Sequence, residues 1–291
     1  MAEEQNYIKV KVDKGHISAI GERLYSESVE LVRELVNNAY DADAVEVRVT
    51  IEPDMVVVED NGAGMDVKGL EEYFNIGSGN KKRHPRSPRF NRTRIGEFGI
   101  GKFSALTASR KFEVHTKKGT SYAKVVFDRD EWEKSEERWY LPLVVEPAPV
   151  EMPDGTKVVL SNLTKHFDAA EVEKKIIDGT PLSAPDFTVF LNNRRVLGKT
   201  VQGKVIPFME GTSYGIIQGQ VIIPHALKAL GPGEVGLACK VKGVTIKRDS
   251  FGLEFMTASL KRVTGEVHAD FLPITSDRNG FITDSPEYKE F

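Results

Sequence analysis

A glycine-rich stretch, GEFGIGKFS at residues 96–104, constrains this chain more than any other feature. It is one letter from the phosphate-binding loop G-x-x-x-x-G-K-[ST], with Phe103 where that loop carries a hydroxyl that binds magnesium. That loop also follows a buried strand, whereas here a basic run, KKRHPRSPRFNRTRI, precedes the glycines. Glycines that lead into a helix still expose backbone N–H groups, which attract an anion. The stretch therefore predicts an anion-binding segment of another kind, with its magnesium ligand elsewhere in the chain.

The composition excludes several classes of protein. The 291 residues are enough for two modest domains, and contents of 40% hydrophobic and 29% charged residues are typical of a soluble globular protein. No apolar run is long enough for a membrane span, and the first residues, MAEEQNYIKV, lack the apolar region of a signal peptide. Cys239 is the only cysteine, so we expect no internal disulfide and a reducing, cytoplasmic location. The net charge of −3 gives the whole chain no strong preference for nucleic acid.

Residues 28–44, SVELVRELVNNAYDADA, are predicted to form an amphipathic helix. Its apolar residues recur with the helical period, and Glu34, Asn38 and Asp41 fall together on another face. A carboxylate such as Glu34 can orient or deprotonate a water, and the amide oxygen of Asn38 can bind Mg²⁺. The alternative is a solvated polar face of an ordinary helix.

Two strands are predicted next, at residues 45–51 and 55–59, and the second leads into Asp60-Asn61-Gly62. A carboxylate at a strand end, such as Asp60, can accept a hydrogen bond from an exocyclic amine like that of adenine. Gly62 and Gly64 would let the backbone approach a planar ring closely. The alternative is an ordinary Asp-Asn-Gly turn.

The rest of the chain predicts an α+β protein with two parts. A short helix is expected at residues 66–75, a loop at 76–100 and a helix at about 101–109, followed by strands in KFEVHT, SYAKVVF, WYLPLVV and TKVVLSNL. A boundary is expected near residues 164–182. Short strands then recur in DFTVFL, VIPF, GIIQGQVII, EVGLACKV and VTIK, with a turn at Asn192-Asn193.

In chain order, ELVNNAYDADA, VEDNGAGM, IGSGNKK and GEFGIGKFS resemble the N-box, the first glycine box, the lid hinge and the second glycine box of the GHKL ATPases. This superfamily includes DNA gyrase B, MutL, the MORC proteins, the ninety-kilodalton heat-shock chaperones and the sensor histidine kinases. The resemblance implies a Bergerat-type ATP-binding α/β sandwich at residues 1–168, with an ATP lid at about 76–100. A smaller α/β transducer-like domain, similar to ribosomal protein S5, would follow at 169–291.

The resemblance also implies a role for each matching residue, with ATP and Mg²⁺ as the cofactors. Glu34 would be the general base for the water that attacks the γ-phosphate, and Asn38 would bind Mg²⁺. Asp60 would bind the adenine amino group directly and through a water shared with Thr156. The other residues expected at the nucleotide are Asp41, Ala42, Gly62, Gly64, Met65, Gly77, Lys81, Gly99, Ile100, Gly101, Lys102 and Phe103. Lys81 and Lys102 could instead be solvated lysines.

Two basic features leave alternatives open. The stretch LPITSDRNGF resembles the transducer loop whose cation reaches the γ-phosphate, which is Lys in MORC-like proteins and Arg in the chaperones. Arg278 holds that position here, so it is either a second catalytic residue or a surface arginine in a turn. The basic run from Lys82 to Arg94 could bind DNA or an acidic partner, but we favour a solvated flexible loop.

The main functional hypothesis is an ATP-operated clamp that dimerises when it binds ATP, with residues 1–25 crossing to the other copy. Its cargo would be DNA, in maintenance or defence, or a protein client, as for a chaperone. One alternative is a nucleotide-binding module with little turnover. Another is a kinase of the histidine type, but Glu34 favours hydrolysis, because that branch does not use a glutamate base.

Overall fold

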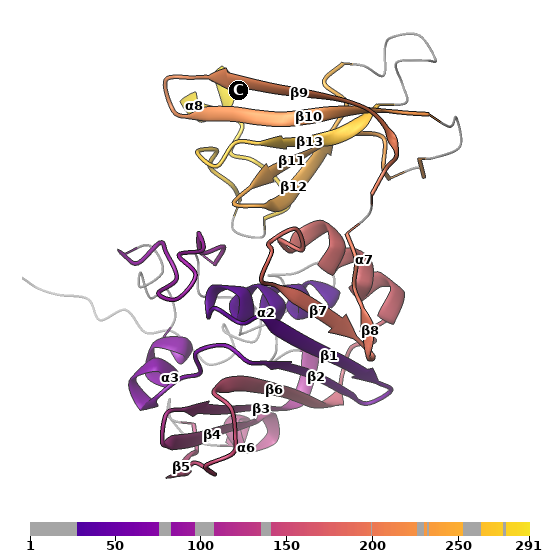
Figure 1. Ribbon diagram of the computed structural model, residues 1–291. Helices are drawn as coiled ribbons and strands as arrows, with labels where there is room; N and C mark the ends of the chain where they lie inside the picture. Colours follow the sequence, from indigo (N-terminus) through magenta and orange to yellow (C-terminus); the bar gives the residue numbers. More distant parts are fainter. Residues whose placement is uncertain are drawn as a thin grey trace, which may run out of the picture.

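The computed structural model describes residues 28–75, 83–96, 108–134, 141–198, 200–225, 230–231, 233–252, 263–275 and 278–291. These residues form an eight-stranded and a five-stranded sheet, and helices α2 (Val29–Asp41) and α7 (Ala169–Gly179) lie between the two sheets (Figure 1). This is the α+β sandwich expected from the sequence. The predicted strand at residues 7–12 and most of the predicted helix at 101–109 lie outside the described residues, although Ser109 already belongs to a strand.

The eight-stranded sheet has the order β5-β4-β3-β6-β2-β1-β7-β8. Every pair of neighbours is antiparallel except β1 and β7, which run parallel. The strands are β1 (Glu46–Glu52), β2 (Met55–Asp60), β3 (Ser109–Lys118), β4 (Ser121–Asp128), β5 (Leu143–Pro147), β6 (Gly155–Leu163), β7 (Thr188–Leu191) and β8 (Arg194–Arg195). Two shorter helices, α3 (Val67–Phe74) and α6 (Arg129–Lys134), connect them. The predicted strands at residues 45–51 and 55–59 and the helix at 66–75 are confirmed within a residue or two.

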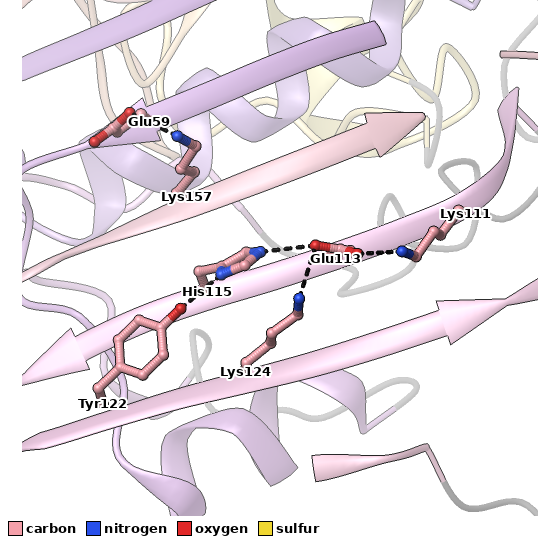
Figure 2. A network of polar contacts seen from close by, with 7 residues as sticks. All are labelled: Glu59, Lys111, Glu113, His115, Tyr122, Lys124 and Lys157. Carbon is pink, nitrogen blue, oxygen red and sulfur yellow. Dashed lines mark hydrogen bonds and ion pairs between the residues drawn. The ribbon is translucent and has the colours of Figure 1, made fainter. Parts of the chain in front are cut away.

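Alternation along the strands separates the two faces of this sheet. Even-numbered residues of β2, β3 and β6, such as Val58, Phe112 and Leu160, are buried against the helices. Odd-numbered residues point to the outer face, where Glu113 accepts hydrogen bonds or ion pairs from Lys111, His115 and Lys124 (Figure 2). Partial burial alone would raise the pKa of Glu113, but these three partners outweigh it and lower the pKa to about 2. The outer face is thus held by polar contacts, and the core lies on the helix side.

Helix α2 is buried on all sides, although its sequence predicts one polar face. Two of its polar residues, Glu30 and Asn37, are covered by α7, which lies about 140 residues further along the chain. Asn37 donates to the carbonyl of Gly179 at 3.0 Å, and Lys175 donates to Glu30 at 2.7 Å. Gly179 has no room for a side chain, because an added Cβ would lie 2.2 Å from Cδ of Arg33. A solvated polar face is therefore wrong for α2, since its polar side chains are used in packing.

The five-stranded sheet has the order β12-β11-β13-β10-β9, with β11 and β13 parallel and the other neighbours antiparallel. Its strands are β9 (Gly203–Gly211), β10 (Ile216–Pro224), β11 (Gly236–Val241), β12 (Val244–Asp249) and β13 (Thr264–His268), and a short helix, α8 (Pro286–Glu290), follows them. Buried residues of β11 and β12, including Cys239 and Val244, belong to the same apolar core as α2 and α7. The two sheets therefore share one packed interior.

The expected domain boundary after residue 168 does not coincide with the change of sheet. Helix α7 and strands β7 and β8 lie beyond that point, yet β7 pairs with β1 from Glu46↔Thr188 to Val49↔Leu191. A division between β8 and β9 keeps each sheet whole, and we propose it instead. None of the helices in the described ranges is both long enough and apolar enough to cross a membrane.

Candidate nucleotide-binding site

Three polar residues of the eight-stranded sheet lie on its helix side. Asp60, Thr116 and Thr156 have the same parity as the core residues of β2, β3 and β6, and they lie at neighbouring ends of these strands. Asp60 is directly opposite Thr156, which is directly opposite Thr116. The hydroxyl oxygens of the two threonines are 3.3 Å apart, and that of Thr116 also accepts the N–H of Met65 at 2.8 Å. The expected adenine-binding residues Asp60, Met65 and Thr156 are therefore brought together.

Asp60 combines a local turn contact with an unusual electrostatic environment. Its Oδ1 accepts the N–H of Gly62 at 2.8 Å, which is the contact of an ordinary Asp turn. Burial nevertheless raises the pKa of Asp60 to about 6, and the N–H groups of Gly62 and Thr156 oppose this only partly. The carboxyl remains mainly ionised at neutral pH and can accept a hydrogen bond from an amine.

The glycines of the first glycine box are required by neighbouring backbone. Gly64 has a φ of +60°, and an added Cβ would lie 1.9 Å from the carbonyl oxygen of Lys117. At Gly62 the nearest atom would be the carbonyl oxygen of Ala42, at 2.7 Å. That same carbonyl accepts the N–H of Ala63 at 2.8 Å, which ties the box to the end of α2. The structure thus gives a packing reason for both glycines, beside the close approach to a ring expected from the sequence.

Glu34 and Arg278, the two residues predicted to be catalytic, form an ion pair. Nη1 of Arg278 lies 3.3 Å from Oε2 of Glu34, and the side chains are only 5% and 10% exposed. Arg278 therefore is not a surface arginine, which was the alternative left open by the sequence. It has a φ of +57°, a backbone conformation that few residues other than glycine adopt. A residue from the C-terminal part thus reaches the N-box helix.

Tyr73 of α3 shows that Glu34 and Asp60 border one region. Desolvation is the largest cause that raises the pKa of Tyr73, and the charges of Glu34 and Asp60 both add to it. The hydroxyl oxygen of Tyr73 is itself buried, so its electrostatic environment includes both carboxylates. Sequence reasoning did not single out Tyr73 or Thr116. The signal for Thr116 was present, because alternation places it on the buried face after Phe112 and Val114.

Asn38 is half-buried and lies one helical turn beyond Glu34, so both side chains project from the same side of α2. The amide and carboxylate oxygens are hard donors, which suit Mg²⁺. Among the described residues, no group of three or more His, Cys, Asp or Glu could hold a metal on its own. Mg²⁺ usually takes one or two protein ligands together with phosphate oxygens and water.

Asp41, at the end of α2, binds the backbone that leads into the second glycine box. Its two carboxylate oxygens accept the N–H groups of Ile95 and Gly96 at 2.7 and 2.9 Å. The start of GEFGIGKFS is thereby fixed one turn from Asn38. Several residues expected at the phosphates lie outside the described residues, namely Gly77, Lys81, Gly99, Ile100, Gly101, Lys102 and Phe103.

Comparison with known proteins agrees with this geometry. Residues 25–159 match the model of a family described as histidine kinase-, DNA gyrase B-, and HSP90-like ATPase. The chain is 29% identical over 181 residues to a protein of Herpetosiphon aurantiacus named as type II restriction enzyme HgiDII, a match that covers 61% of the chain and 29% of that protein.

Two chaperone proteins HtpG are also similar. The protein of Mycolicibacterium vanbaalenii is 30% identical over 185 residues, covering 54% of the chain and 27% of the chaperone. The protein of Borreliella burgdorferi is 29% identical over 130 residues, covering 37% and 21%. The matches thus span less than a third of each of these relatives. By the family match and the ordered motifs, residues 25–159 are similar to the GHKL ATPases.

Proposed function

We propose that the chain binds ATP with Mg²⁺ and hydrolyses it. The observation that carries this proposal is the meeting of Glu34 and Arg278, a base on the N-box helix and a cation from the C-terminal part, in one buried pair. The charge effects of Glu34 and Asp60 on Tyr73 support a single site that runs from the adenine end to the phosphate end.

Each residue has a separate role along the nucleotide. Asp60 accepts a hydrogen bond from the adenine amino group, and Thr156 and Thr116 supply hydroxyls beside it. Asn38 is the protein ligand of Mg²⁺, which when bound would neutralise charge on the phosphate oxygens. Glu34 takes a proton from the water that attacks the terminal phosphorus, while the bond to the bridging oxygen breaks and ADP leaves. Arg278 places positive charge where negative charge develops.

The first experiment compares Glu34→Gln with Glu59→Gln, an exposed carboxylate on the outer face of β2. Loss of the general base should lower phosphate release by about 100-fold or more, while ATP still binds. Glu59→Gln should leave both unchanged. Full turnover in Glu34→Gln would remove Glu34 from this role. Tight binding without phosphate release in the unaltered chain would favour a nucleotide-binding module.

Nucleotide-gated dimerisation is the second part of the proposal, and it follows the behaviour of the family. The test is to measure the mass of the particle in solution with and without Mg²⁺ and a non-hydrolysable ATP analogue. A dimer that forms only with the analogue supports an ATP-operated clamp. A monomer under both conditions contradicts it.

A chaperone-like action on protein clients is a second candidate function, supported by the HtpG relatives. Exposed apolar side chains of the second sheet, including Val205, Met209 and Ile216, could contact an unfolded client. ATP-dependent suppression of the aggregation of a heat-denatured enzyme would support it. The other candidate cargo is DNA, and a cytoplasmic location stays a prediction from the sequence.

A further inference from the structure

Residues 83–96 form a compact hairpin, which we call the basic hairpin. Arg86 and Thr93 pair as an antiparallel bridge, the N–H of Ser87 donates to Arg92, and that of Arg94 donates to Pro85. The segment contains five arginines and a histidine, and it contains no acidic residue. In Figure 1 it is the short purple segment beside one end of α2.

The hairpin is anchored by a buried arginine at its base. Arg92 is 8% exposed, and its guanidinium donates to the carbonyls of Tyr40, Ala44 and Asp186 at 3.2, 2.7 and 2.7 Å. It also lies over the rings of Tyr40 and Phe187. Since Tyr40 is in the last turn of α2, this positive charge stabilises the C-terminal end of the helix dipole. The buried Arg92 therefore departs from the solvated flexible loop favoured from the sequence, whereas Arg83, Arg86 and Arg89 are exposed.

Two buried aspartates add a second anchor. Asp43 accepts the N–H groups of Arg89 and Phe90 at 2.8 and 3.2 Å, and Asp41 binds Ile95 and Gly96 as described above. Both carboxylates are therefore used on backbone N–H groups, not on the exposed arginines. The tip of the hairpin is thus fixed to Asp43, just after α2, and its end to Asp41, the last residue of α2.

The arginines that remain at the surface point their charge at solvent. Arg83, Arg86 and Arg89 are exposed, and within the described ranges none of them forms an ion pair with a carboxylate. Arg86 is ordered by donation to the carbonyl of Asn91, and Arg89 lies over the ring of Phe90. Because the anchors already hold the backbone of the hairpin, the hairpin would lose less conformational entropy when a ligand binds these side chains.

We propose that the basic hairpin is a surface that binds the phosphate backbone of nucleic acid. Arginine matches phosphate through paired hydrogen bonds, and backbone contacts of this kind need fixed positive charge but no sequence reading. A protein partner would need apolar or aromatic anchors at its centre, and the large apolar side chain at the tip, Phe90, is half-buried beneath Arg89 and Arg92. This proposal makes nucleic acid the cargo of the ATPase proposed above, but binding to the hairpin does not require ATP hydrolysis.

The test measures binding of a fluorescent DNA duplex of about 30 base pairs to the full chain without nucleotide, from about 50 to about 200 mM salt. The triple variant Arg83→Ala, Arg86→Ala, Arg89→Ala should weaken binding about tenfold or more at the lowest salt. If each arginine neutralises one phosphate, the slope of log affinity against log salt should fall by about 3 × 0.9, or about 2.7. The charge-matched control is Arg194→Ala, Arg195→Ala, Lys204→Ala, three exposed residues elsewhere, which should keep the slope of the unaltered chain.

Several results would overturn the proposal. They are no duplex binding by the unaltered chain, equal losses in the two triple variants, or a salt slope that does not change. A polyglutamate peptide that binds through the three arginines while the duplex does not would assign the surface to an acidic protein instead. Glu34→Gln should bind the duplex normally, so a failure of the ATPase proposal and a failure of this one give different results.

Discussion

The buried ion pair between Glu34 and Arg278 allows a quantitative test of how the C-terminal part is joined to the N-box helix. Both side chains are almost fully buried, at 10% and 5% exposure. Removing one partner of such a pair leaves an uncompensated buried charge, which typically costs about 3–5 kcal/mol. We therefore expect Glu34→Gln and Arg278→Met each to lose about 3 kcal/mol of unfolding free energy in the absence of nucleotide.

The double variant isolates the interaction energy of the pair from the other contributions of the two side chains to stability. With both charges gone, no uncompensated charge remains, so the double variant should lose about 2 kcal/mol in place of the sum of about 6 kcal/mol. The coupling energy would then be about 4 kcal/mol. Arg278→Met keeps the same backbone cost at a φ of +57°, so the cycle reports the side chain alone.

The assay is urea unfolding of the four proteins, with a second cycle as the control. Asp66 and Lys118 also form an ion pair, at 2.9 Å, but their side chains are 51% and 48% exposed. Their coupling should be about 0.5 kcal/mol or less, because water and salt screen exposed charges. Additive losses at Glu34 and Arg278, within about 0.5 kcal/mol, would refute the reasoning.

Three further changes test single residues of the site. Gly64→Ala should lower the unfolding free energy by about 2–4 kcal/mol, because its Cβ would meet the carbonyl of Lys117. The control Gly119→Ala, with a φ of +59° and open space around it, should lower it by only about 1 kcal/mol. Equal losses of stability in thermal melting would contradict the clash. Asp60→Asn should stabilise the nucleotide-free protein by up to about 3 kcal/mol at pH 7.5. The pKa of Asp60 is about 6 in the folded protein and 3.8 in the unfolded chain, so the unaltered protein loses stability as pH rises between these values. That gain should vanish below about pH 4, and a pH-independent gain would contradict it. Arg92→Lys should cost about 2 kcal/mol in urea unfolding, because an ammonium cannot match three carbonyls and three rings at once. A neutral result would show that the anchor is not needed.

Local patterns in the sequence predicted the elements that carry the site. The helical period of Leu31, Val32, Leu35 and Val36 placed α2, alternation placed β1, and a short apolar run placed β2. These features depend on neighbours within a few residues, so they can be read without the fold. The N-box and the first glycine box also lie on such elements, which is why Glu34, Asn38 and Asp60 could be assigned positions in the site.

The features that the sequence did not predict depend on distant contacts. The parallel pairing of β7 with β1 moves the change of sheet beyond residue 168, and no local signal marks such a pairing. Arg92 is buried because its guanidinium binds carbonyls of Ala44 and Asp186, which are distant in the sequence. The basic run alone therefore could not predict which arginine would be buried. The same holds for Glu30 and Asn37 of α2, which are covered by α7.

Helix α2 contacts three other parts of the molecule through acidic side chains along its length. Its start is bound to α7 through Glu30, its middle to the C-terminal part through Glu34, and its end to the second glycine box through Asp41. A helix of this length moves as one rigid body, so a shift at any one contact changes the geometry at the others. An ion pair suits the middle contact better than an apolar one would. A nucleotide bound in the site would bring further negative charge to the region of Arg278, and added charge changes the strength of an ion pair more than that of an apolar contact.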